Sequence, residues 1–146
     1  MNMKNAFRAL SGALMGLITW LTQLMGGWDA ALSLLFLLMG LDMVTGVITG
    51  LMRKSANTPG GGFLSRAFFE GLTRKLMMGL LVILATALDS LLASSVCRLA
   101  VIGFYGANEA LSIVENAALL GVPFPKGLLE ALERFRDSQE EDVKPS

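Results

Sequence analysis

The sequence predicts an all-α membrane protein with three to four hydrophobic helices, at about 9–28, 30–52, 76–97 and 99–122, and a short amphipathic C-terminal helix. Two observations predict this class. Of the 146 residues, 53% are hydrophobic and only 16% are charged, and the mean hydropathy is +0.60. A water-soluble domain of this length needs a more polar surface, so the excess of apolar residues favours a lipid bilayer.

The composition also excludes several kinds of chemistry. The chain has no His and one Cys, and its formal net charge is zero. Such a chain has no Ser-His or Cys-His catalytic pair, no Cys/His metal site and no intrachain disulfide. We therefore expect no enzymatic activity, no metal, no cofactor and no nucleic-acid partner, because no catalytic constellation and no overall basic field are present.

The first expected helix begins after Lys4 and Arg8 and runs without charge from Ala9 to Trp28. About 20 apolar residues suffice to cross the hydrocarbon layer. A cleaved signal peptide is the alternative, but the stretch is long for one and no A-x-A site follows it. Gly12 and Gly16 have the GxxxG spacing of close helix packing in lipid, although chance produces such pairs too. Met1 and Met3 offer two translation starts, either by chance or to give two products.

The second expected helix, at 30–52, follows a turn at Gly26-Gly27-Trp28-Asp29 and contains one charge, Asp42, near its middle. An ionised carboxylate there costs about 2.5–3.5 kcal/mol on insertion scales. Asp42 is therefore either a functional residue or a buried carboxyl that bonds a neighbouring helix. Gly46 and Gly50 repeat the GxxxG spacing on the same helix.

The loop at 53–75 is basic and is expected on the cytoplasmic side. It holds five basic residues against Glu70, a net charge of +4. Lys4 and Arg8 place the N-terminus on the same side, which agrees with two spans between them. A short helix at 66–72 is expected to lie on the headgroups after a flexible connector at 57–62. The residues expected to fix this topology and to touch anionic lipid are Arg53, Lys54, Arg74 and Lys75.

The third expected helix, at 76–97, contains Asp89 in its more polar half. This carboxylate is either a deep functional residue or an ordinary interfacial one. Arg98 follows nine residues later, more than two helical turns away, so the two side chains do not pair unless the chain bends.

The fourth expected helix, at 99–122, carries a narrow polar stripe along an otherwise apolar rod. Steps of three and four residues place the stripe on one helical face. Either this helix spans and the stripe lines a lumen or a subunit seam, or it lies flat in the interface and the chain has three spans. Pro123 and Pro125 are expected to end it. The stripe consists of Tyr105, Asn108, Glu109, Ser112, Glu115 and Asn116.

The chain is expected to consist of a membrane domain at 1–125 and an amphipathic, charged C-terminal segment at 126–146. Between Lys126 and Asp137, apolar residues recur on one side of an expected short helix, and Glu130 and Arg134 form a favourable i,i+4 pair. The apolar residues of this side are Leu128, Leu129, Leu132 and Phe135.

Several of these elements resemble the phage holin family that includes clostridial toxin-secretion holins. The segment Leu41-Asp42-Met43-Val44-Thr45-Gly46 is similar to its LDxxTG element, and Gly71-Leu72-Thr73-Arg74-Lys75 to its GLxRK element, with Asp89 late in the next span. The most specific match is the C-terminal signature, which reads Tyr105, Asn108-Glu109, Ser112-Ile113, Glu115-Asn116, Gly121-Val122-Pro123 and Pro125.

The resemblance implies a multi-pass protein of the bacterial inner membrane that forms homo-oligomeric lesions. Those lesions release an endolysin, which lyses the host cell, or a large toxin, and an antiholin is a further partner. In this interpretation the pore and assembly residues are Asp42, Asp89 and the stripe. There are two alternatives. A small ion channel or transporter subunit also has embedded carboxylates, and an antiholin has the same architecture but forms no lesion of its own.

Overall fold

The computed structural model describes residues 2–52, 65–123, 125–128, 130–131 and 133–134. Within this part the chain is all-helical, with four long helices: α1 at Met3–Leu24, α2 at Ala30–Leu51, α3 at Ser65–Leu92 and α4 at Val96–Leu119. Arg53, Lys54, the connector at 57–62, the tail, and Leu129, Leu132 and Phe135 of the expected C-terminal helix lie outside the described residues. Helical residues do occur at 126–128, 130–131 and 133–134.

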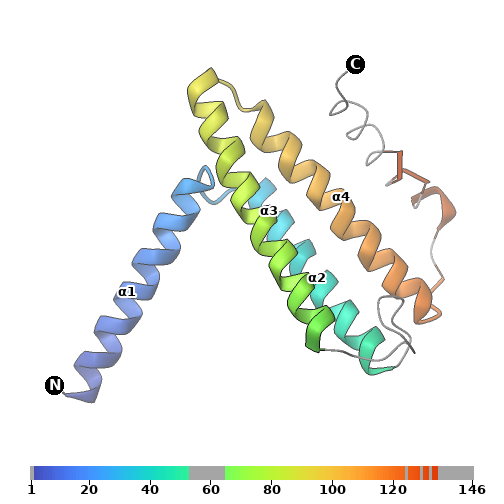
Figure 1. The fold of residues 1–146 in the computed structure, drawn as a ribbon, viewed down its shortest axis with the longest axis horizontal. Helices are drawn as coiled ribbons and strands as arrows, with labels where there is room; N and C mark the ends of the chain where they lie inside the picture. Colours follow the sequence, from blue (N-terminus) through green and yellow to red (C-terminus); the bar gives the residue numbers. More distant parts are fainter. Residues whose placement is uncertain (1, 53–64, 124, 129, 132, 135–146) are drawn as a thin grey trace.

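Helices α2, α3 and α4 pack side by side as a bundle, while α1 diverges from it (Figure 1). The small apolar core lies near the end where α1 meets α2, and Val82 of α3 and Ile102 of α4 belong to it. The remaining members of this cluster are Met25, Leu32 and Leu35.

Most large apolar side chains point outward from the bundle. Leu37 and Val44 on α2 and Leu80 and Leu84 on α3 are all exposed. Two helices of the described chain, Ala30–Leu51 and Ala67–Leu92, are long and apolar enough to cross a membrane. Helices α1 and α4 do not meet the same criterion, so the expected set of three to four hydrophobic helices is confirmed for two of them only.

The turn between α1 and α2 is the one expected from the sequence. Gly26 and Gly27 have φ values of 89° and 88°, in the left-handed region that glycine adopts without strain. Asp29 then caps α2 by accepting a hydrogen bond of 2.8 Å from the backbone N–H of Leu32, which satisfies one of the unpaired donors at a helix start. Helix α1, at Met3–Leu24, thus begins six residues earlier and ends four residues earlier than the predicted helix at 9–28.

Helix α3 corrects the prediction at both of its ends. The expected surface helix at 66–72 is not separate but forms the first turns of α3. The helix also ends at Leu92 instead of residue 97, because Ala93 has a positive φ of 51°. The backbone N–H of Ser94 then bonds the carbonyl of Asp89 at 2.9 Å. The helix needs this reversal so that α4 can return along the bundle.

Helix α4 ends before the two prolines that were expected to end it. Its last residue is Leu119, and Gly121 follows with φ 84°. The N–H of Val122 bonds the carbonyl of Ala117 at 3.0 Å, and that of Gly121 bonds Ala118 at 2.9 Å. These are the two bonds of a glycine-terminated helix end, so the glycine stops the helix and Pro123 only prevents its resumption.

Candidate functional site

The centre of the bundle holds three charged side chains, one from each of α2, α3 and α4. The ammonium of Lys75 lies 2.8 Å from the Oδ2 atom of Asp42 and also donates to the Oε2 atom of Glu109. The side chains of Lys75 and Glu109 are only 8% and 6% exposed. We call Asp42, Lys75 and Glu109 the charged triad.

The depth of the triad follows from the helical register. Asp42 is twelve residues beyond the start of α2, and Glu109 thirteen beyond the start of α4. At 1.5 Å per residue, both carboxylates lie about 18–20 Å from the end of the bundle where these helices begin. The triad therefore lies near the middle of α2, which is one of the two helices apolar enough to cross a membrane.

The hydrogen bonds of the triad are satisfied within the bundle, and its net charge depends on the ionisation of its two carboxyls. Among the described residues, no buried side-chain nitrogen or oxygen lacks a hydrogen-bond partner. With both carboxyls ionised, one ammonium faces two carboxylates, so one net negative charge stays inside the bundle. A buried ion pair loses the hydration of both ions, and removal of one partner is much more costly than the pair itself. The triad consequently makes the helix arrangement sensitive to any change in charge.

A second polar contact joins α2 and α4 beyond the triad. The Nδ2 atom of Asn116 donates to the hydroxyl of Thr45 at 3.1 Å, and that hydroxyl donates to the carbonyl of Asp42 at 3.1 Å. A Cβ atom on Gly46 would lie 3.9 Å from Asn116, so this glycine also faces α4. Both contacts belong to the same interface between α2 and α4.

The polar stripe of α4 thus turns toward the other helices of the same chain. Glu109 is buried, Tyr105 packs against the apolar core, and Glu115 is exposed. The other three stripe residues, Asn108, Ser112 and Asn116, are partly buried. Whether the stripe also lines a lumen or lies on a membrane surface stays a prediction. Within the chain, Glu109 and Asn116 bond the neighbouring helices.

Asp89 has a local role that the sequence reasoning did not assign. Its carboxylate accepts hydrogen bonds from the backbone N–H groups of Cys97 at 2.9 Å and Arg98 at 2.8 Å. Asp89, in the last turns of α3, therefore caps the start of α4. The N-cap residue Ser95 makes no capping hydrogen bond with its own side chain. The bend at Ala93 brings Asp89 close to Arg98, and the contact is with the backbone N–H of Arg98 and not with its guanidinium.

The side chain of Arg98 ties the ends of the helices together. Its Nε atom donates to the carbonyl of Met25 at 2.6 Å, and its two terminal nitrogens reach the Asp29 carboxylate at 2.7 and 3.1 Å. One terminal nitrogen also reaches the carbonyl of Gly27 at 3.3 Å. We call this set of bonds the Arg98 anchor. The hydrogen bonds from Arg98 lower the pKa of Asp29 to about 2.

Sequence reasoning missed Lys75 and Arg98 as members of these sites. Lys75 was predicted only as a topology residue, and its ion pairs were not foreseen because its partners lie more than 30 residues away in sequence. Spacing gave no signal for them. The sequence did indicate that Arg98 needs hydrogen-bond acceptors, because its guanidinium lies at the start of an apolar helix. It did not show which of several possible acceptors Arg98 would bind.

The structure places the two glycine pairs differently. No neighbouring side chain or distant backbone atom lies within 4 Å of a Cβ built on Gly12 or Gly16, so in the described part of the chain these two positions are open. Gly46 faces α4, and Gly50 is buried. Among the described residues, no group of three His, Cys, Asp or Glu side chains is arranged to hold a metal ion.

Comparison with known proteins gives several relatives that are similar over most of this chain. A protein of Clostridium perfringens called uncharacterized 14.9 kDa protein in nagH 3'region is 32% identical over 139 residues, which is 94% of this chain and all of that protein. YqxH of Bacillus subtilis is 35% identical over 75% of this chain and 74% of its own length. The probable holin of Bacillus phage phi105 is 33% identical over 77% of this chain and 79% of its own length.

No solved structure matches the chain. A family comparison, however, matches residues 19–137 with the bacteriophage holin family. This range contains the charged triad, the Arg98 anchor and the polar stripe. The chain belongs to the bacteriophage holin family.

Proposed function

We propose that this protein is a holin whose subunits assemble in the bacterial plasma membrane into lesions that release a cytoplasmic endolysin or a large toxin. The family, the probable holin among the relatives and the two apolar helices support a membrane protein with a holin role. The observation that carries the proposed mechanism is the charged triad, because its charges are enclosed by the helices of one subunit.

In the proposed mechanism, the bundle is the closed state of the subunit. Its outer faces on α2 and α3 are apolar and suit lipid, and its charges are paired inside. In a lesion, the same helices line water, and the triad charges gain hydration once they separate. Ionised groups cost little in a water-filled lumen and about 2.5–3.5 kcal/mol each in lipid, so exposure to water offsets the loss of the ion pairs.

The net charge of the triad gives the membrane potential a way to act on this exchange. One elementary charge that moves across the whole membrane changes the free energy by about 2.3 kcal/mol per 100 mV. Loss of the potential removes that term and shifts the balance between the closed subunit and the open assembly. Closed subunits can therefore accumulate while the membrane potential is present and convert together to the open assembly when it is lost.

The first experiment is expression of the full chain in a bacterium together with a cytoplasmic muralytic enzyme. The expected result is growth without damage, followed by abrupt loss of membrane potential and release of the enzyme. Depolarisation without passage of the enzyme would instead identify a small channel. Harmless expression that delays lysis by another holin would identify an antiholin.

A second experiment tests the role of the triad with Glu109→Gln. The glutamine still accepts a hydrogen bond from Lys75, but the remaining Asp42–Lys75 pair is neutral and is less costly to bury. The closed subunit should therefore persist longer and lysis should begin later. Glu115→Gln is the matched control, because Glu115 lies on the same helix but is exposed. Equal lysis times for both variants and the parent chain would remove the triad from the mechanism.

A further inference from the structure

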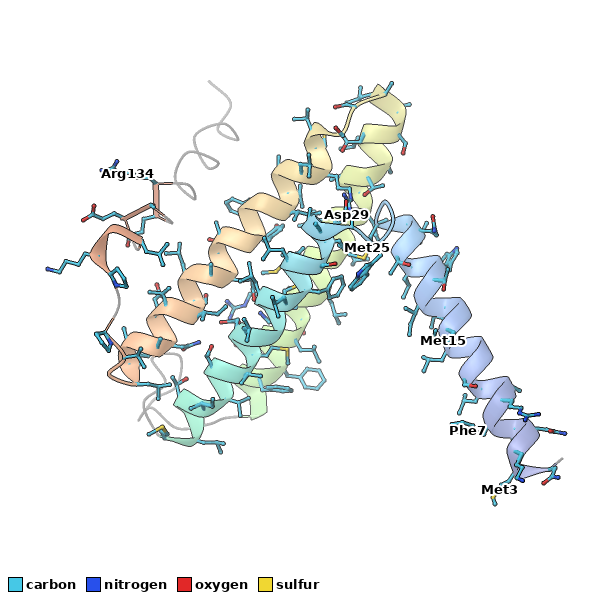
Figure 2. All side chains as sticks on the ribbon, turned by 180° about the vertical axis from the view of Figure 1, so that it is seen from behind. Met3, Phe7, Met15, Met25, Asp29 and Arg134 are labelled. Atoms are coloured by element: carbon cyan, nitrogen blue, oxygen red, sulfur yellow. The ribbon has the colours of Figure 1, made fainter. Side chains whose placement is uncertain are left out.

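Helix α1 presents a separate surface that the bundle leaves uncovered. It diverges from the other helices (Figure 1), and its side chains project into open space along its length until Met25, next to the bundle (Figure 2). Met25 is buried, whereas Phe7 and Leu10 are 73% and 71% exposed. The tertiary structure therefore does not explain why α1 is apolar.

The side chains of α1 are segregated around the helix axis. With about 100° per residue, all its polar and charged side chains fall in one sector of about 120°. The one large apolar side chain in that sector is Met15. The polar side chains of this sector are Lys4, Asn5, Arg8, Ser11, Thr19, Thr22 and Gln23.

The opposite side of α1 is a broad apolar surface. Trp20 lies at the boundary between the two sides, where an amphipathic ring suits a membrane–water interface. All these side chains apart from Met25 are exposed. The apolar surface is formed by Met3, Phe7, Leu10, Leu14, Leu17, Ile18, Leu21 and Leu24, with Met25 at the C-cap.

Charge shows which occupant suits this surface. The charged residues of α1 are Lys4 and Arg8, both basic, and both lie in the polar sector. A helix with an apolar face, basic residues on its polar face and interfacial aromatics is suited to lie in the plane of a membrane whose headgroups are anionic. A helix that crosses lipid has no need for such a segregation.

We propose that α1 lies along the surface of an anionic membrane, with its apolar side in the acyl boundary, and does not cross the bilayer. This replaces the expectation of a first span at 9–28, and it agrees with the absence of α1 from the two helices that are apolar enough to cross. Met25 supports the orientation, because it belongs to the apolar side and packs on α3 near Gly79. The same side thus continues from the bundle onto lipid.

Labelling of single cysteines in the full-length protein tests this placement. In a Cys97→Ser background, two polar positions, Ser11→Cys and Thr19→Cys, are compared with their apolar neighbours, Leu10→Cys and Leu17→Cys. If α1 lies flat, a membrane-impermeant maleimide should label both polar positions several-fold faster than their neighbours, from the same side of the membrane. The neighbours are the matched controls, because each lies within about 3 Å in depth of its partner if the helix stands upright.

Other labelling patterns overturn the proposal. Protection of all four positions, whichever side they occupy, would show that α1 crosses the bilayer. Faster labelling of the apolar positions would show that the polar side packs against protein, such as a second copy of the chain. Neither result would test the proposed holin function, because the release of the muralytic enzyme measures that function separately.

The lipid dependence is tested with the protein in vesicles. In vesicles that contain phosphatidylglycerol, the ratio of Thr19→Cys to Leu17→Cys labelling should be higher than in phosphatidylcholine alone. The double change Lys4→Gln and Arg8→Gln should abolish this difference, whereas Lys126→Gln, on the described chain beyond the bundle, should leave it intact. An equal ratio in both lipids for the parent chain would exclude an anionic surface as the occupant.

Discussion

Lys75 of α3 donates a hydrogen bond of 2.8 Å to Asp42 of α2, inside a bundle whose outer faces are apolar. The same ammonium also bonds Glu109 of α4, so one cation joins three helices. Lys75, which was expected at the membrane surface, therefore lies at the centre of the helix bundle.

Replacement of Lys75 by Met should destabilise the bundle strongly. It leaves two carboxylates that face each other without a cation, and loss of one partner of a buried ion pair costs about 3–5 kcal/mol. Thermal unfolding in detergent micelles measures the change. The triple variant Lys75→Met, Asp42→Asn and Glu109→Gln has no buried charge and should recover most of the loss. A triple variant as unstable as the single one would show that packing, not charge, causes the effect.

Replacement of Asp29 by Asn should remove a pH-dependent part of the stability. The pKa of Asp29 is lowered to about 2 from an ordinary value of 3.8, first by its hydrogen bond with Arg98. A lowered carboxyl pKa stabilises the folded state above the unfolded-state pKa, and the contribution is lost as the pH falls through the folded-state value. The parent chain should therefore lose this stability between about pH 4 and pH 2.

The difference in melting temperature between the parent chain and Asp29→Asn measures this contribution. It should be constant from neutral pH to about pH 5 and should shrink toward pH 2. Asp29 is 47% exposed as a side chain, so the solvent screens the pair and the difference should be small. A difference that does not change with pH would show that the charge of the Asp29 carboxylate does not cause the effect, because asparagine keeps the oxygen that caps α2.

Replacement of Asp89 by Ala should destabilise the junction between α3 and α4 by about 1 kcal/mol, because two backbone N–H groups lose their acceptor. Asp89→Asn keeps one acceptor oxygen and should retain part of the stability. Hydrogen exchange at the amides of Cys97 and Arg98 is the direct measurement, and both should lose protection in the Ala variant. Unchanged protection at these two amides would contradict the cap.

Two glycines should respond oppositely to Ala. Gly46 has room, with its nearest neighbour 3.9 Å from an added Cβ, and Gly to Ala within a helix gains about 1 kcal/mol. An added Cβ on Gly26 would lie 2.7 Å from the Nε atom of Arg98, and its φ is 89°. Gly26→Ala should therefore lower the melting temperature and Gly46→Ala should raise it. Similar shifts for both would contradict the close approach of Arg98.

The break between α1 and α2 was predictable, since it depends on neighbouring residues. Gly26, Gly27 and Asp29 form a turn and a cap from local chemistry alone, and the prediction of a helix from 30 to 52 is confirmed within one residue by α2. The end of α3 was not predictable in this way. Ala93 adopts a positive φ without being glycine, and the bonds that Asp89 makes across the bend help to stabilise it.

The sequence by itself determined that the chain is helical, apolar and free of histidine, and that Glu109 and Asn116 share one face of a helix. Periodicity shows that such residues lie together, because a helix fixes the angle between successive side chains. Only the tertiary structure decided that this face turns inward and meets Lys75 and Thr45. That choice depends on the packing of three helices, since a buried charge is stable only where the fold brings its partner from a distant part of the chain.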